Sequence, residues 1–471
     1  MNLFGRPWQH DCGGLEEPNP GRLRKGMVIK MAKRRRRTYS YQKFSYQSSR
    51  ERERKRKRRR IAVLSVMAVL LLLGAGFAVG RKLLRTDTPE EIGAVLTGGP
   101  VLAEDVSGVP EADGQGAEQD GEGGQWETAQ EIWADTHLKV KGIYVTGPMA
   151  GSGGFQDLLT LVDETELNAM VIDVKNDEGQ ITYSMELESA GNMGACVAYI
   201  RDMEGLMAQL KEHGVYTIAR IVCFKDPCLA KNRPELALTK PDKTPIVDAN
   251  GLAWVNPYEQ GVWEYLTDVA LQAAEDGFDE IQFDYVRFPI GEDADQADYG
   301  VDMEAYPKQQ AITEFLVYAT ERLGEKGIPV TADVFGTIIG SETDVERVGQ
   351  DYVRLGQTVR ALCPMVYPSH YGNGVFGLAV PDAHPYETVL EALTDSREEL
   401  EAVSEEQRAV VRPWLQAFTA TWVQGHISYN GEEIRSQIQA VYDAGYEEWF
   451  LWNATNRYTA DGLLSAEESG G

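Results

Sequence analysis

Eight short apolar runs, each rich in β-branched and aromatic residues, recur after residue 138 of this 471-residue chain. Between them lie amphipathic stretches whose apolar residues follow the 3.6-residue period of a helix. Four of these stretches are followed by a glycine that can cap a helix, namely Gly214, Gly277, Gly327 and Gly445. Strand and helix repeated eight times predict an α/β fold, the (β/α)8 TIM barrel, over residues 138–471.

The predicted strands cover residues 140–146, 169–175, 216–224, 280–288, 329–335, 361–367, 410–418 and 447–453. The predicted helices cover residues 155–167, 203–212, 262–276, 304–325, 345–359, 386–406 and 432–443. The competing α/β fold is a doubly wound sheet, which requires a phosphate-binding glycine loop after its first strand. The glycine-rich turn at residues 147–154 matches neither GxGxxG nor a P-loop, so the barrel is favoured.

Charge is strongly segregated along the chain. Residues 1–60 hold 20 basic and 5 acidic residues, whereas the segment from residue 86 onward holds 23 basic against 68 acidic residues, or −45. Because so large a negative charge repels a polyanion, no nucleic-acid partner is expected. The basic leader at residues 1–60 is predicted to fix membrane topology, with nucleic-acid or anionic-lipid binding as the alternative.

Residues 61–80 contain no charged residue. As a helix they would extend about 30 Å, the thickness of a hydrocarbon core. The basic flank before them predicts a single-pass cell-membrane anchor with the N-terminus in the cytoplasm and the barrel outside, and a cleaved signal peptide is the alternative. Residues 81–137 are predicted to be a flexible acidic linker, since residues 86–137 hold 13 acidic and no basic residues.

The sequence predicts neither a metal nor a cofactor. Cys223 and Cys228 lack the CxxC spacing of a zinc site, and the cysteines after residue 138 are expected to be free thiols. The acidic residues between positions 292 and 304 could bind Ca²⁺, but a solvated loop is the favoured interpretation.

In a barrel of this type the chemistry lies at the C-terminal ends of the strands, and polar residues gather there in the sequence. Asp173 and Lys175 are two residues apart on the second strand and are therefore expected to share a face. The candidates on the later strands are Asp284, Tyr285, Arg287, Asp333, Tyr367, His370, Tyr371, Arg412, Trp414, Gln416, Trp452 and Asn453. Carboxylates within apolar strands need partners, because a buried unpaired charge is costly.

Several of these segments carry a family resemblance. They are WVNP at residues 254–257, GFDEIQFDYVRFP at 277–289, TADVFG at 331–336, PMVYPSHY at 364–371, RPWLQAF at 412–418 and FLWNAT at 450–455. Together they resemble the putative glycoside hydrolase barrel family of membrane-anchored bacterial proteins, and more distantly the amylase-like barrels. The resemblance implies a TIM-barrel enzyme that cleaves glycosidic bonds, with a nucleophilic Asp at the end of the fourth strand.

Glycosidic cleavage requires one ionised and one protonated carboxyl group on either side of the bond. We assign the ionised role to Asp284, with Arg287 or Lys175 nearby to keep it charged, and the acid role to Asp333. Amylase-like barrels carry a Glu at the end of the fifth strand, so the acid assignment stays open and Asp173 is the alternative. The opposing interpretation is structural, with Asp284 paired to Arg287 and Asp173 paired to Lys175.

The remaining candidates are assigned to substrate binding. His370 would hydrogen-bond sugar hydroxyls, and Lys175, Arg287, Gln416 and Asn453 complete the polar set. Sugar rings would stack on Trp254, Tyr285, Tyr367, Tyr371, Trp414 and Trp452, for which core packing is the alternative.

The sequence thus predicts a membrane-tethered, extracytoplasmic glycoside hydrolase acting on an envelope or extracellular polysaccharide. A catalytically inactive barrel that binds cell-wall glycan is one alternative. A barrel that serves only as an interaction scaffold is the other, because a fold alone does not fix a function.

Overall fold

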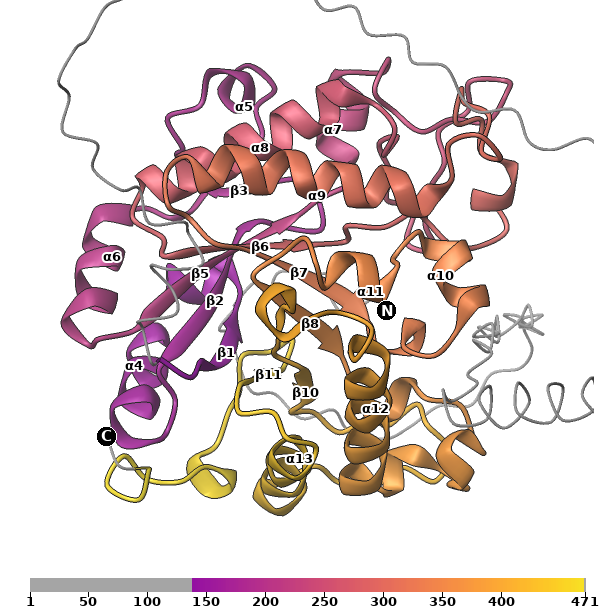
Figure 1. Cartoon of the computed structure of the whole chain (residues 1–471). Coiled ribbons are helices and arrows are strands. Elements are labelled where there is room, and N and C mark those ends of the chain that lie inside the picture. The colour runs from indigo at the N-terminus through magenta and orange to yellow at the C-terminus, as the bar shows by residue number, and fades with distance from the viewer. Residues whose placement is uncertain (1–137, 470–471) are drawn as a thin grey trace, which may run out of the picture. The chain divides into compact units, whose positions relative to one another are not determined.

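A computed structural model describes residues 138–469, in which eight parallel strands close into a barrel surrounded by helices (Figure 1). β1 pairs with both β2 and β11, and this double pairing closes the sheet. The barrel strands, in spatial order, are β1 (Lys141–Val145), β2 (Ala169–Lys175), β5 (Tyr216–Val222), β6 (Glu280–Asp284), β7 (Val330–Phe335), β8 (Ala361–Met365), β10 (Trp414–Gln416) and β11 (Trp449–Trp452). Each lies within one of the eight predicted runs, so the predicted barrel is confirmed.

Two apolar cores follow from the alternation of side chains along each strand. On β2, Val171 belongs to a small cluster inside the barrel, together with Tyr144 and Trp414. Its neighbours Met170 and Ile172 belong to the large cluster between strands and helices. All seven residues of β2 are buried, as expected for a parallel strand covered on both faces.

The outer helices agree with the predicted amphipathic stretches, with one exception. They are α4 (Phe155–Glu164), α6 (Met203–Glu212), α8 (Gln260–Glu275), α9 (Lys308–Gly324), α10 (Glu342–Val348), α11 (Tyr352–Leu355), α12 (Pro385–Leu400) and α13 (Gly431–Asp443). The exception is the helix predicted at 345–359, which divides into α10 and α11. Gly349 ends α10 with a φ of 78°, a left-handed conformation that no helix continues through.

Several elements were not predicted. An excursion after β2 comprises β3 (Ile181–Tyr183), α5 (Glu188–Asn192) and β4 (Cys196–Ile200), and α3 (Gly147–Ala150) and α7 (Pro227–Asn232) follow β1 and β5. The run at 410–418 divides into β9 (Val410–Val411) and β10, because Pro413 has no N–H for a continuous ladder. The short 3-10 helices are η1 (Ala294–Gln296), η2 (Gly336–Ile338), η3 (Pro368–His370), η4 (Val375–Gly377), η5 (Pro381–Ala383), η6 (Glu405–Gln407) and η7 (Ala460–Gly462).

The predicted leader, membrane anchor and acidic linker, residues 1–137, lie outside the described residues. Between residues 138 and 469, no helix has the length and apolar character needed to cross a bilayer. The four cysteines in this range are free thiols, as predicted.

A buried ion triad occupies the end of the barrel where the strands begin. Arg412 donates from Nε to Glu448 at 2.8 Å and from Nη1 to Glu280 at 2.8 Å. Glu280 also accepts a hydrogen bond of 2.9 Å from the Thr331 hydroxyl. The sequence analysis placed Arg412 among the residues at the C-terminal strand ends, and this prediction was wrong. Because Pro413 interrupts the run, β10 begins only at Trp414, and Arg412 lies before it. Its role in this triad is structural.

Arg412→Ala should lower the free energy of unfolding by about 3–5 kcal/mol, because it leaves Glu280 and Glu448 buried and unpaired. The measurement is thermal unfolding of the full chain. The control is Lys326→Ala, whose partner Glu275 lies 4.0 Å away with both side chains 62% exposed, and which should cost less than about 1 kcal/mol. Equal effects of the two substitutions would contradict a buried triad.

Candidate active site

Arg220 holds two carboxylates at the end of the barrel where the strands finish. It lies on β5, directly opposite Asp173 of β2 in the strand register. Its Nη1 donates to Asp173 Oδ1 at 2.6 Å, and its Nε and Nη2 donate to Asp284 Oδ2 at 2.9 Å and 2.5 Å. All three side chains are less than a tenth exposed. Three neighbouring strands, β2, β5 and β6, therefore place a carboxylate, a guanidinium and a second carboxylate side by side in the mouth of the barrel.

The sequence analysis expected Arg287 or Lys175 in the place that Arg220 holds. Lys175 instead pairs with Asp226 at 2.9 Å and donates to the Val222 carbonyl, with its side chain fully buried. The register of β2 against β5 shifts between Asp173 and Lys175, so the two side chains do not share a face. The predicted structural pairs, Asp284 with Arg287 and Asp173 with Lys175, are absent from the described residues. The sequence did contain a signal for the correct partner, because Arg220 is the one charged residue in the apolar run at 216–224.

The backbone turns sharply at Asp284. Tyr285, the next residue, has a φ of 50°, which costs a non-glycine residue about 1–2 kcal/mol. In this conformation its N–H donates to Asp284 Oδ1 at 2.6 Å. Both oxygens of Asp284 are thus held, one by Arg220 and one by the strained turn. Strain of this kind is typical of functional sites.

Asp333 is the neighbour of Asp284 in the barrel and has a different environment. Phe283 of β6 pairs with Ala332 of β7, so the next residue on each strand is one of the two carboxylates. Asp333 Oδ1 accepts a hydrogen bond of 2.7 Å from the Trp414 indole N–H. Burial, reinforced by the charge of Asp284, raises the pKa of Asp333 well above its usual value. Burial therefore favours the protonated form of Asp333.

Asp173 is the third carboxylate at this end of the barrel. Its Oδ2 accepts a hydrogen bond of 2.6 Å from the hydroxyl of Tyr144 on β1. Burial raises the pKa of Asp173 to about 6, although the Arg220 cation and the tyrosine hydroxyl act against this shift. Tyr144 was not among the predicted site residues, because a tyrosine in an apolar strand has no sequence signal that separates it from core.

Aromatic rings extend from Tyr144 to the surface. Tyr144 stacks on Trp452 with 6.2 Å between ring centroids, and Trp452 contacts Phe418 at 5.3 Å. Phe418 stacks on Trp422 at 5.8 Å, and Trp422 is 40% exposed. Tyr367 lies beside Trp452 at 5.7 Å. Of this row the sequence analysis identified Tyr367 and Trp452 but not Phe418 or Trp422.

The other predicted binding residues fall into two groups. The side-chain amides of Gln416 and Asn453 form hydrogen bonds within the protein. Gln416 donates to Asp382 and to the Phe418 carbonyl, and Asn453 donates to the carbonyls of Ala417 and Arg457. Tyr371 packs in the core outside the barrel and Trp414 inside it, as the core-packing alternative predicted.

His370 is exposed on η3, with its ring 5.2 Å from that of Tyr367. Trp254, Tyr285 and Arg287 form a separate cluster, with the Arg287 guanidinium carbon 4.9 Å from the Trp254 ring and 5.1 Å from the Tyr285 ring. The structure thus brings His370 and Tyr367, and separately the cluster of Trp254, Tyr285 and Arg287, to the strand ends that carry the carboxylates.

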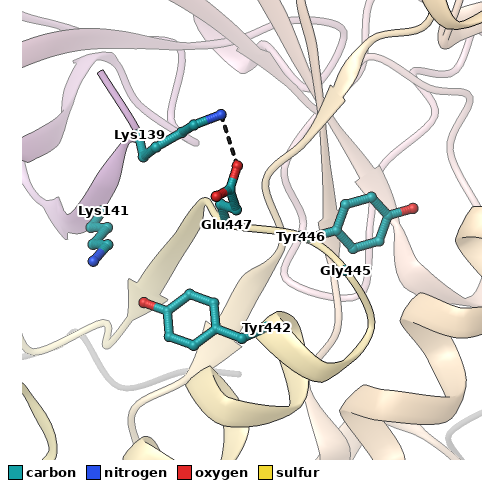
Figure 2. A pocket seen from close by; sticks show the side chains of 6 residues that line it. All are labelled: Lys139, Lys141, Tyr442, Gly445, Tyr446 and Glu447. Atoms are coloured by element: carbon teal, nitrogen blue, oxygen red, sulfur yellow. Dashed lines mark ion pairs between the residues drawn. The ribbon is translucent and has the colours of Figure 1, made fainter. Parts of the chain in front are cut away.

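No cluster of His, Cys, Asp or Glu within residues 138–469 is arranged to hold a metal ion. A surface hollow of about 500 Å³ lies at the opposite end of the barrel, where β1 and β11 begin (Figure 2). Lys139 and Glu447 form an ion pair of 2.8 Å there, flanked by Tyr442 and Tyr446. This hollow is remote from the carboxylates in the barrel mouth.

The pKa of Asp173 makes stability depend on pH. In the unfolded chain an Asp titrates near 3.9, so between about pH 4 and 6 the folded protein binds a proton that the unfolded chain has lost. Stability should therefore fall as the pH rises from 4 to 6, by up to about 3 kcal/mol from this group. In Asp173→Asn that part of the slope should disappear, as measured by thermal unfolding midpoints from pH 4 to 7.5. The exposed control Asp157→Asn should keep the wild-type slope; the idea fails if both variants behave alike.

The comparisons with known proteins identify the family of this chain and support its fold. Residues 142–458 match the model of a family described as a putative glycosyl hydrolase domain. No curated protein matches the chain at a significant level. Among solved structures, a hypothetical protein from Ruminiclostridium thermocellum is 35% identical and covers 41% of this chain and 97% of its own, with a TM-score of 0.38.

Two more distant structures show what else this chain is similar to. The PgaB (BpsB) glycoside hydrolase domain from Bordetella bronchiseptica is 12% identical over 69% of this chain and 95% of its own, with a TM-score of 0.50, and supports the barrel fold. The α-galactosidase TtGalA from Thermus thermophilus is 14% identical over 72% and 64%, with a TM-score of 0.42. The family model covers most of the chain, and this chain therefore belongs to the family described as a putative glycosyl hydrolase domain.

Proposed function

We propose that this protein hydrolyses O-glycosidic bonds of an envelope or extracellular polysaccharide, with Asp284 as nucleophile and Asp333 as general acid. One observation carries the proposal: two carboxyl groups on neighbouring strands have opposite environments. Asp284 is ion-paired with Arg220, whereas burial and the adjacent Asp284 charge raise the pKa of Asp333. Acid–base cleavage of a glycoside needs two carboxyl groups whose environments differ in this way, one favouring the ionised form and one the protonated form.

The reaction then proceeds in two steps. Asp333 gives its proton to the glycosidic oxygen as the bond to the anomeric carbon breaks, and an Asp284 oxygen forms a bond to that carbon. Water, deprotonated by Asp333, next releases the sugar and restores both groups. Adjacent parallel strands lie about 5 Å apart, and this register suits the short carboxyl separation of retaining enzymes better than the wider gap of inverting ones.

The neighbouring side chains have supporting roles. Arg220 and the Tyr285 N–H orient Asp284, and Tyr144 orients Asp173, the alternative second carboxylate. The aromatic row that includes Trp452 and ends at Trp422 offers flat apolar faces to sugar rings beyond the cleaved bond.

The proposal includes the location of the enzyme. Residues 61–80 would anchor it in the cell membrane, residues 1–60 would remain in the cytoplasm, and residues 81–137 would let the barrel reach polysaccharide outside. Support comes from the uncharged run of 20 residues and from the 20 basic residues that precede it.

The test is release of new reducing ends by the full chain from a panel of bacterial envelope and extracellular polysaccharides. Asp284→Asn should lower the rate at least about a thousandfold, because an amide cannot form the glycosyl ester. Asp333→Asn should lose most activity on polysaccharide but keep activity on an aryl glycoside whose leaving group needs no proton.

Asp157→Asn, a surface carboxylate on α4, is the matched control and should retain full activity. Retention is checked by the anomer first released, observed by NMR. If one polysaccharide binds wild type and Asp284→Asn equally and none is cut, the inactive glycan-binding barrel is the better account.

A further inference from the structure

Arg287 is a buried cation without a carboxylate partner. Arg287 is 7% exposed, and within residues 138–469 no acidic side chain forms an ion pair with it. Its guanidinium instead lies among three aromatic rings, with its carbon 4.5 Å from the ring centre of Phe335, 4.9 Å from Trp254 and 5.1 Å from Tyr285. Cation–π contacts offset part of the cost of burying this charge, but they supply no hydrogen-bond acceptor.

Two hydrogen-bond donors in this cluster lack an acceptor. Arg287 Nη1 donates to the Phe288 carbonyl at 2.9 Å, but Arg287 Nε has no partner. The indole N–H of Trp254 is likewise buried without a partner in the described part of the chain. Leaving a buried donor unsatisfied costs about 1–3 kcal/mol, and more for a charged group. The cluster is therefore short of acceptor atoms.

The cluster adjoins the carboxylate pair. Arg287 and Tyr285 follow Asp284 at the end of β6, and Phe335 ends β7 two residues after Asp333. The charge of Asp284 also acts on the pKa of Arg287, which burial lowers. A group bound to Arg287 would thus lie next to the glycosidic bond that Asp284 and Asp333 are proposed to cleave.

The other cations of the site differ from Arg287. Arg220 is paired with Asp173 and Asp284. Lys225 is shared between Asp177 at 3.6 Å and Asp248 at 3.4 Å. Only Arg287, of these three, forms no ion pair with a carboxylate.

We infer that Arg287, with the indole N–H of Trp254, binds an acidic group on the sugar next to the cleaved bond, which makes the substrate an anionic polysaccharide. This rests on the proposed function, whose substrate class it narrows. A guanidinium matches the paired oxygens of a carboxylate or a phosphate, and contact in a desolvated cluster is stronger than in water. Asp284, Asp248 and Asp177 act on Arg287 electrostatically but form no ion pair with it within residues 138–469, so direct contact of an acidic ligand with the guanidinium must outweigh the repulsion from these carboxylates.

The experiment compares each acidic polymer with its own neutral form. A uronic-acid polysaccharide is paired with the same polymer after reduction of its carboxylates to alcohols, and a phosphate-substituted glycan with its dephosphorylated form. The full chain, Arg287→Gln, Arg287→Lys and Trp254→Phe are assayed for kcat/KM. Dissociation constants are measured with all four in the Asp284→Asn background, and thermal unfolding shows that each variant folds.

Wild type should prefer the acidic over the neutral polymer at least tenfold, and whichever pair shows the preference identifies carboxylate or phosphate. Arg287→Gln should abolish the preference, and Arg287→Lys should keep part of it because it retains the charge. Trp254→Phe should reduce it threefold to tenfold by removing one donor. Equal use of both polymers by wild type, or an unchanged preference in Arg287→Gln, would overturn the inference.

The two proposals fail separately. Cleavage of a neutral polymer that depends on Asp284 but not on Arg287 would retain the hydrolase and discard the acidic substrate. Tight binding of an acidic polymer that depends on Arg287, without cleavage of any polymer, would retain the anion site and discard the hydrolase.

Discussion

The ion contacts of Arg220 are the interaction on which the mouth of this barrel depends. A carboxylate inside a barrel of apolar strands is too costly unless a cation meets it, and Arg220 meets Asp173 and Asp284 at once. The planar guanidinium can do this because its donors project in fixed directions toward the strands on either side. One side chain thereby allows two carboxylates to lie at the ends of β2 and β6, the strands on either side of β5, and leaves the third, Asp333, without an ion-pair partner among the described residues.

That asymmetry connects the fold to the chemistry. Asp284 and Asp333 have the same side chain and equivalent positions on neighbouring strands, so only their surroundings distinguish them. Arg220 and the strained Tyr285 turn contact Asp284, whereas the Trp414 indole and the apolar interior surround Asp333. At the other end of the barrel an arginine between two carboxylates has a structural role instead, because Arg412 pairs with Glu280 and Glu448, and all three residues are buried.

The barrel itself was predictable because its signals are local. Each strand is a run of apolar residues long enough to be buried on both faces, and helix-ending glycines mark most of the intervals. The predictions failed where a single residue changes the backbone, as at Gly349, which divides a helix, and at Pro413, which displaces Arg412 to the far end of the barrel. The Asp173–Lys175 pairing failed for a similar reason, since a register shift on β2 turns the two side chains apart.

The sequence by itself determined the eight strands, their order along the chain, the family and the carboxylates at the strand ends. Only the tertiary structure decided which charges meet. Arg220 comes 47 residues after Asp173 and 64 before Asp284, and pairing across such separations depends on the register of closed strands rather than on spacing along the chain. It also decided that Arg287 stays unpaired among three rings, because the rings come from two strand ends and a distant loop that meet only when the barrel closes.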